Sequence, residues 1–189
     1  MHLDRTGWLL PSATVQLAPS PNANPRPANC GPYLLVIHNI SLPPNQFTGE
    51  AVVRFFQNQL DFDAHPWFEN IRGVTVSAHF FIRRDGQVVQ CVSTEQRAWH
   101  AGLSCFENKS GCNDFSIGIE LEGADQIPYA LEQYQQLAAL TQLLAKRYPI
   151  RAIRGHEHIA PGRKTDPGPS FDWWYYANQC SLPLRFFPE

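Results

Sequence analysis

The chain has 189 residues, 43% of them hydrophobic, and its 15 basic and 17 acidic side chains give a formal net charge of −2. This length and apolar content suit one domain that buries its own core. The near balance of charge excludes a general electrostatic attraction to nucleic acid or to an anionic membrane surface, and no apolar run reaches the roughly 18 residues of a membrane-spanning helix.

The first residues do not have the pattern of a secretion signal. Asp4 stands beside Arg5, and the apolar patch extends only from Trp8 to Leu10, whereas a signal peptide needs a basic region followed by about 7–15 apolar residues. We therefore expect a cytoplasmic protein. The cysteines agree, because they are scattered without a C-x-x-C pair, as is typical of reduced thiols. They are Cys30, Cys91, Cys105, Cys112 and Cys180.

Residues 1–32 are expected to form an extended N-terminal leader packed on the domain, because much of this segment is rich in Pro, Asn and Ser. Residues 34–37 are a short apolar run that predicts a buried strand ending at His38. Residues 48–60 have apolar side chains at helical spacing, and residues 61–73 are irregular.

A hairpin is predicted next. Residues 74–82 alternate between two faces, Asp85-Gly86 is a turn signal, and residues 87–92 form the return strand. Residues 99–114 read as a long polar loop, and residues 116–121 as another strand.

The strongest helix is predicted over residues 129–148, where an apolar stripe ends at Pro149. Residues 150–153 form a last short strand, followed by loop. This order predicts an α+β protein with a central mixed β-sheet flanked by helices. We expect one catalytic domain over residues 33–175 and a C-terminal tail over residues 176–189.

Ionisable residues stand at or near the ends of several predicted strands. His38 follows the first strand, Glu120 lies in the strand over 116–121, and His156 follows the last strand, ten residues before Asp166. Active sites are built in this way on sheets. Two imidazoles and one carboxylate suit a catalytic zinc, which keeps a fourth position for water. Glu120 could then move protons, and Lys164 could stabilise an oxyanion.

Spacing alone leaves other interpretations open. A single histidine is more often structural than a ligand, and Glu120 could be a buried carboxylate with a basic partner. Arg163 and Lys164 could lie in a solvated basic turn. His156-Glu157-His158 is not H-E-x-x-H, and the Gly and Pro around it argue against a helix.

Six longer motifs are more specific: LLVIHNISLPP (34–44), VSAH (76–79), IRRDG (82–86), RAWHAG (97–102), CNDFSIGIELEG (112–123) and KTDPGPSFDW (164–173). With these motifs the chain resembles the AmpD-type 1,6-anhydro-N-acetylmuramyl-L-alanine amidases, a group of zinc N-acetylmuramoyl-L-alanine amidases. That family shares its fold with peptidoglycan recognition proteins and T7-type lysozyme. The resemblance extends from about His2 to Trp173.

The resemblance implies one Zn²⁺ per chain, bound by His38, His156 and Asp166, with Glu120 and Lys164 as the catalytic pair. The implied reaction is hydrolysis of the amide between the lactyl group of 1,6-anhydro-N-acetylmuramic acid and L-alanine in a muropeptide. It implies a monomer that serves cytoplasmic peptidoglycan recycling and indirectly controls β-lactamase induction, with no nucleic acid or membrane partner.

Substrate contacts are implied for five further residues: Asn39, His79, Trp99, His100 and Ala101. Trp99 could instead be a core side chain, and His79 could make a structural hydrogen bond. Thr75 and Gly111 stand where relatives carry arginines that clamp the stem-peptide carboxylate, so stem preference stays open. The role of His158, two residues from a proposed ligand, also stays open.

Two alternative functions follow from the same resemblance. Some proteins of this fold bind peptidoglycan without cutting it, and those typically lack one metal ligand, whereas all three positions are filled here. Other amidases of the family act on intact peptidoglycan, and a secretion signal would mark them.

Overall fold

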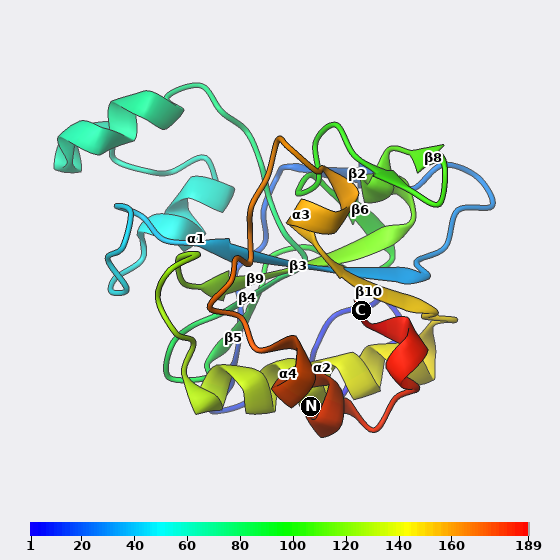
Figure 1. Cartoon of the computed structure of the whole chain (residues 1–189). Helices are drawn as coiled ribbons and strands as arrows, with labels where there is room; N and C mark the ends of the chain where they lie inside the picture. Colours follow the sequence, from blue (N-terminus) through cyan, green and yellow to red (C-terminus); the bar gives the residue numbers. More distant parts are fainter. Residues whose placement is uncertain (189) are drawn as a thin grey trace.

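A six-stranded sheet forms the centre of the computed structural model, which describes residues 1–188 (Figure 1). Its strand order is β1-β5-β4-β9-β3-β10, and every neighbouring pair is parallel except β4 with β5. The strands are β1 (Val15–Leu17), β3 (Leu34–Ile40), β4 (Phe80–Ile82), β5 (Val88–Gln90), β9 (Ser116–Glu122) and β10 (Ala152–Gly155). The predicted α+β class with a mixed central sheet is therefore confirmed.

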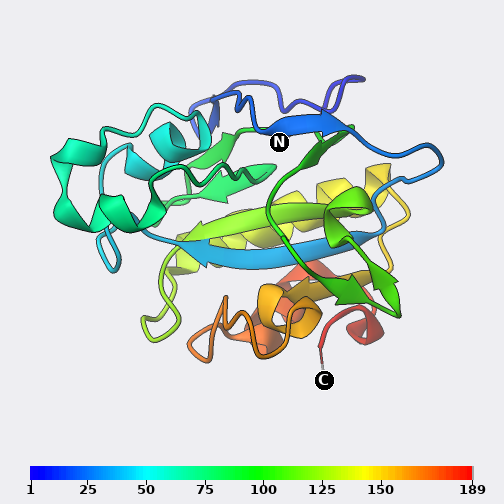
Figure 2. The same ribbon diagram turned by 90° about the horizontal axis from the view of Figure 1, so that it is seen from above.

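β3 and β9 are the two longest strands and run side by side through the middle of the sheet (Figure 2). All seven residues of β9 are buried, and so are the first five of β3. Strands that are covered on both faces have nearly continuous apolar sequences, and for this reason β3 and β9 can be predicted from the sequence. The register pairs His38 with Glu120, so these two side chains lie on the same face of the sheet.

Helix α2 (Leu131–Arg147) covers one face of the sheet, and α4 (Trp173–Cys180) lies beside it (Figure 1). The main core fills this space, because alternate residues of the two central strands point toward α2. They are Leu35, Ile37, Ile117, Ile119 and Leu121, and they pack in one cluster with Leu137, Leu140 and Leu144.

The opposite face is covered by shorter elements. They are α3 (His156–Ile159), the 3₁₀ helix η3 (Cys112–Asp114), and two ribbons, β2 (Ala23–Pro25) with β6 (Gln96–Ala98) and β7 (Cys105–Phe106) with β8 (Lys109–Ser110). A second cluster of Leu34, Val36, Phe115 and Ile159 packs here. His38 and Glu120 emerge on this face at the far end of their strands. Further out lie α1 (Ala51–Phe56), η1 (Phe62–Ala64) and η2 (Pro66–Ile71).

Several elements differ from those expected. Of residues 74–82, only Phe80–Ile82 form a strand. The preceding residues bond to loops instead, since Ser77 N donates to Trp99 O and Asn22 Nδ2 donates to Val76 O. Residues 156–159, expected as loop, form one helical turn. His158 Nδ1 accepts the Gly155 N–H at the start of this turn, 2.9 Å away, and so caps it locally.

The two chain ends contribute regular structure. Residues 1–32 include β1, which pairs with β5 at one edge of the central sheet. α4 extends from residue 173 to 180, so the expected boundary at residue 175 falls inside a helix that packs on α2. η4 (Leu184–Phe186) follows it. Among residues 1–188, no helix combines the length and apolarity needed to cross a membrane.

Candidate metal centre and active site

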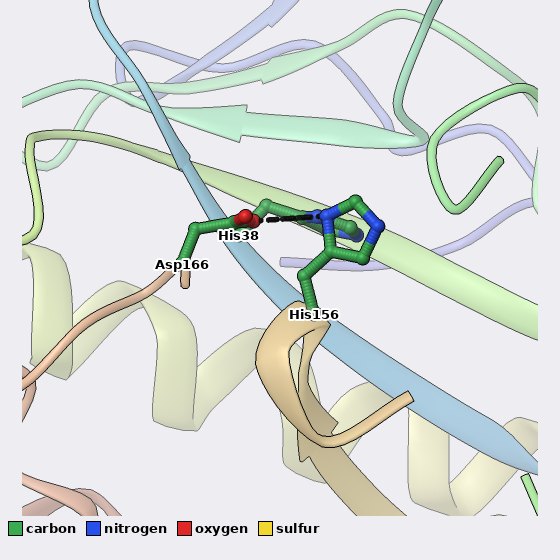
Figure 3. Close-up of side chains that lie close together, drawn as sticks. All are labelled: His38, His156 and Asp166. Carbon is green, nitrogen blue, oxygen red and sulfur yellow. Dashed lines mark hydrogen bonds and ion pairs between the residues drawn. The ribbon is translucent and has the colours of Figure 1, made fainter. Parts of the chain in front are cut away.

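Three elements deliver three potential metal ligands to one point (Figure 3). His38 stands near the end of β3, and β10 runs parallel beside it with Gly155 opposite Ile37. His156, the next residue along, therefore begins α3 next to His38. Asp166 arrives from the following loop, where Glu157 N donates to its backbone carbonyl at 3.0 Å.

The donor atoms of this trio (His38, His156 and Asp166) form a nearly equilateral triangle. His38 Nδ1 lies 3.0 Å from His156 Nδ1 and 3.0 Å from Asp166 Oδ2, and His156 Nδ1 lies 3.1 Å from the same oxygen. Ligands of a tetrahedral zinc, at about 2.0–2.1 Å from the metal, are separated by about 3.3 Å. The donor set and its spacing therefore fit one zinc ion with a further coordination position open.

The electrostatics of the trio favour the unprotonated forms of His38 and Asp166. Burial lowers the pKa of His38, as does the neighbouring His156, and although Asp166 opposes both effects the resulting pKa is about 4. Burial alone would raise the pKa of Asp166, but its close contacts with His156 and His38 hold that pKa well below the usual range. Metal ligands must be deprotonated, so the site is prepared for a cation near neutral pH.

Glu120 is the second functional feature, directly beside His38 on the neighbouring strand. Burial raises the pKa of its carboxyl group well above the ordinary value, and the charge of Asp166 raises it further, while Lys164 lowers it. Its Oε2 is buried without a hydrogen-bond partner among residues 1–188. Buried polar atoms are rarely left unpaired. A carboxyl group with a raised pKa beside a metal site is equipped to accept and return a proton.

The two basic residues before Asp166 differ in their surroundings. Lys164 is exposed, and its charge acts on both His38 and Glu120, so its ammonium group lies within electrostatic range of the site. The Arg163 guanidinium instead donates to the backbone carbonyls of Ala101, at 2.7 Å, and Leu103, at 2.6 Å. Arg163 therefore fastens the loop after residue 100 to the loop that carries Asp166.

Four of the expected substrate contacts lie in hydrogen-bonded surroundings. The Asn39 amide donates to Asp125, Tyr129 and the Pro167 carbonyl at 2.8–3.1 Å. His79 is fully buried, with Gly118 N donating to its Nδ1 and its Nε2 bonded to Gln96 O. His100 and Ala101 are buried beside the two histidines of the trio.

Trp99 is the expected contact with the most accessible ring. It is partly exposed, and its Nε1 donates to Asn24 Oδ1 at 2.7 Å. The polar atom of the indole is therefore satisfied, and part of the side chain is accessible to a ligand. His158 is not grouped with the trio, and its contacts lie elsewhere: its Nδ1 accepts from Gly155 N, and its ring packs edge-on against Trp173.

Sequence reasoning missed several residues that support the site. Asn113 Oδ1 accepts from the backbone N–H groups of His100 and Ala101 at 3.1 and 2.8 Å. Arg26, from the leader, donates to the backbone carbonyls of Asn113 and Ser116. Asn113 lies within a quoted motif, whereas a single arginine in a proline-rich segment gives no signal of burial.

Comparisons with known proteins agree with this geometry. The family model of N-acetylmuramoyl-L-alanine amidase matches residues 29–169. The chain is 54% identical over 175 residues to the 1,6-anhydro-N-acetylmuramyl-L-alanine amidase AmpD of Citrobacter freundii, covering 92% of this chain and 91% of that protein.

Solved structures give the same result. A crystal structure of a selenomethionine AmpD derivative superposes with a TM-score of 0.90 at 52% identity, covering 95% of this chain and 99% of that one. The amidase AmiD of E. coli, solved with anhydro-N-acetylmuramic acid-L-Ala-D-γ-Glu-L-Lys as its substrate, matches with a TM-score of 0.57 at 29% identity. That match covers 82% of this chain and 60% of AmiD.

Proposed function

Because the chain belongs to the N-acetylmuramoyl-L-alanine amidase family, we propose that it is a zinc enzyme that cuts the amide between the lactyl group of 1,6-anhydro-N-acetylmuramic acid and L-alanine in muropeptides. The family makes it an amide hydrolase, as its motifs predicted. The bond and the anhydro sugar are those in the name of the AmpD relatives and in the substrate bound to AmiD.

The proposal assigns the metal to His38, His156 and Asp166, and it rests on one observation above all. The buried carboxyl group of Glu120, with one oxygen unpaired, lies beside a triangle of donor atoms spaced as zinc ligands are. When bound, zinc lowers the pKa of water to about 7 and polarises a carbonyl group. An amide needs such activation because resonance makes its carbon a poor electrophile.

Glu120 accepts the proton of the attacking water and returns it to the leaving nitrogen of L-alanine. Its raised pKa suits both halves of this transfer, since the group must bind the proton and then release it. Lys164 brings a positive charge to the same region and stabilises the oxyanion of the tetrahedral intermediate. Trp99 offers a flat face to the bicyclic sugar.

We place the reaction in the cytoplasm, in the recycling of wall fragments, where it lowers the pool of muropeptides that induce β-lactamase. We propose a monomer as the working unit, because the donor atoms of His38, His156 and Asp166 already converge within a single chain.

The test combines metal content with product analysis. The wild type is expected to hold about one zinc per chain and to release peptide from anhydro-muropeptide. Glu120→Gln should keep the zinc and lose turnover by about 10²–10⁴-fold, whereas His38→Ala should lose the zinc. Metal is measured by atomic emission, and products by mass spectrometry.

Other outcomes separate the alternatives. Equal cleavage of intact peptidoglycan would indicate a wall-lytic amidase instead. Tight muropeptide binding in calorimetry with no released peptide would indicate a binding module. Full activity of His38→Ala or Asp166→Ala would remove the metal assignment, and an active Glu120→Gln would remove Glu120 as the base.

A further inference from the structure

The second nitrogen of His38 begins a buried chain of hydrogen bonds that leads away from the proposed metal. His38 Nε2 lies 2.9 Å from His100 Nδ1, His100 Nε2 lies 3.1 Å from Ser116 Oγ, and Ser116 Oγ lies 2.6 Å from the Cys112 carbonyl oxygen. All three side chains are buried. Each nitrogen of His100 has one partner, and the Ser116 hydroxyl has two, so the direction of each bond in this chain can be derived.

The directions of these hydrogen bonds follow from the end of the chain that is far from the proposed metal, at the Cys112 carbonyl. The Cys112 carbonyl can only accept, so the Ser116 hydroxyl donates to it and accepts from His100. His100 Nε2 then carries its proton, and in a neutral imidazole Nδ1 is left as an acceptor. His38 Nε2 must therefore carry the other proton, which leaves His38 Nδ1 bare and directed at His156 and Asp166.

The ring of His100 is held firmly in this position. A Cβ atom added to Gly118 of β9 would lie only 2.4–2.6 Å from the ring atoms of His100, so the imidazole lies directly on the strand backbone. The backbone N–H of His100 is held by Asn113, as is that of Ala101. Glycine at position 118 thus provides the space that the imidazole occupies.

The same dipeptide also serves the second histidine of the trio. His156 Nε2 lies 3.1 Å from the carbonyl oxygen of Ala101, which can only accept, and 3.3 Å from Arg163 Nη2, which can only donate. Arg163 Nη2 gives its two protons to the shorter bonds with the carbonyls of Ala101, at 2.7 Å, and Leu103, at 2.6 Å. His156 Nε2 therefore carries its own proton and donates it to Ala101, and His156 Nδ1 is bare as well. Residues 100–101 therefore set the tautomer of both imidazoles, one through a side chain and one through the backbone.

We propose that His100, supported by Ser116, is a positioning residue that fixes His38 as a metal ligand, rather than a substrate contact. The inference rests on the proposed function, because it takes the trio as the zinc site. Hydrogen bonds to the outer nitrogen of a ligating histidine fix its tautomer and ring orientation, and losing them typically costs 10–100-fold in metal affinity.

The experiment measures the zinc dissociation constant by competition with a chelator of known affinity, together with the melting temperature of the metal-free protein. His100→Leu fills the space but cannot accept from His38, so zinc binding should weaken about 10–100-fold. His100→Asn can place an oxygen near the position of Nδ1 and should recover much of the affinity. Gly118→Ala changes no hydrogen-bonding group yet displaces the ring, and should weaken zinc binding like His100→Leu.

Thr141→Val is the matched control. It removes another buried hydrogen bond, the one between Thr141 and Tyr176 under α4, 2.6 Å long and remote from the trio. It should lower the melting temperature and leave the zinc affinity unchanged. A merely structural His100 would make His100→Leu behave in the same way as this control.

The outcomes separate the two proposals. A wild type that binds no zinc overturns the proposed zinc enzyme. A wild type that binds zinc, with His100→Leu and Gly118→Ala equally tight, overturns the positioning role alone. If His100→Leu does not fold, Ser116→Ala tests the positioning role instead, because it removes only the hydroxyl group that accepts from His100. Weaker zinc binding in that variant supports the proposed positioning of His38 by His100 and Ser116, and unchanged zinc affinity contradicts it.

Discussion

Three buried histidines lie within one side-chain layer above β9. Burial lowers the pKa of His38 to about 4 and of His79 to about 3, and it lowers that of His100 well below the ordinary value. Their rings lie at centroid separations of 5.0 Å for His38 with His100 and 5.8 Å for His79 with His100. All three side chains are therefore neutral at pH 7 in the metal-free protein. In acid, each of them takes up a proton when the protein unfolds, and this favours the unfolded state.

Because His79 is not one of the proposed metal ligands, it allows this loss of free energy of unfolding in acid to be measured separately from metal binding. Its folded pKa lies below the unfolded value of 6.5, so its stabilising contribution is present above pH 6.5 and is lost as the pH falls toward 3. Between pH 7 and pH 5 the metal-free wild type should lose about 2 kcal/mol more of its free energy of unfolding than His79→Asn. Urea denaturation at each pH measures this difference, and parallel curves for the two proteins would contradict it.

Neighbouring residues on a strand can have unrelated roles. His38 and Asn39 are adjacent, yet side chains alternate between faces, so His38 meets the trio while the Asn39 amide binds Tyr129, Asp125 and the Pro167 carbonyl. Pro167 follows Asp166 directly. Asn39 thus supports the loop that carries a proposed ligand.

At the scale of elements, the leader is joined to the site by Arg26, which follows β2. Its guanidinium is buried and donates to the carbonyls of Thr94, Asn113, Asp114 and Ser116. Burial lowers its pKa to about 10, so it stays charged at pH 7. One side chain therefore links the leader to the loop before β6, to η3 and to β9.

Removing this link should be costly. Arg26→Met leaves several buried carbonyl groups without their donor, and we expect a loss of about 3 kcal/mol or more in the free energy of unfolding. Arg54→Met, at an exposed position of α1, is the control and should change stability by less than about 0.5 kcal/mol. Denaturant titration compares the two. Equal small effects would mean that the leader contributes little to the domain.

At the scale of the whole molecule, secondary structure is predicted best from the sequence where one apolar pattern continues over several residues. β3, β9 and α2 have apolar patterns that burial on the sheet imposes, and the expected helix over 129–148 is observed as Leu131–Arg147. β1 has three residues, too few for a pattern. α3 is one turn, defined by a local cap from His158.

The candidate site divides in the same way. His38, Glu120, His156 and Asp166 stand at strand ends or in specific motifs, so spacing made them candidates and the resemblance to a known family selected them. The supporting contacts of His79, His100 and Asn39 depend on which face of the sheet each side chain takes and on partners far away in sequence. Spacing carries no information about such partners. α4, with its adjacent aromatic residues, likewise depends on packing against α2.

Metal removal should act on the whole fold. A ligand that binds only the folded state stabilises it by about 4 kcal/mol at a free concentration 1,000 times its dissociation constant. For a chain of this size that corresponds to a rise in melting temperature of about 8–16 °C. Calorimetry with and without chelator measures the shift, with His38→Ala as a variant that should not respond. An unchanged melting temperature after complete zinc removal would show that the ion adds nothing to stability.

His38 is 118 residues from His156 and 128 from Asp166 along the chain. In the proposed zinc enzyme, an ion bound between them would tie the first long strand to the last third of the polypeptide, and the population of intact molecules would follow the free zinc concentration. Zinc starvation would then reduce the number of enzyme molecules that survive proteolysis, in addition to the fraction that can turn over. Pulse-chase measurements would reveal this effect as a shorter half-life of the wild-type protein in zinc-limited cells than in zinc-replete cells.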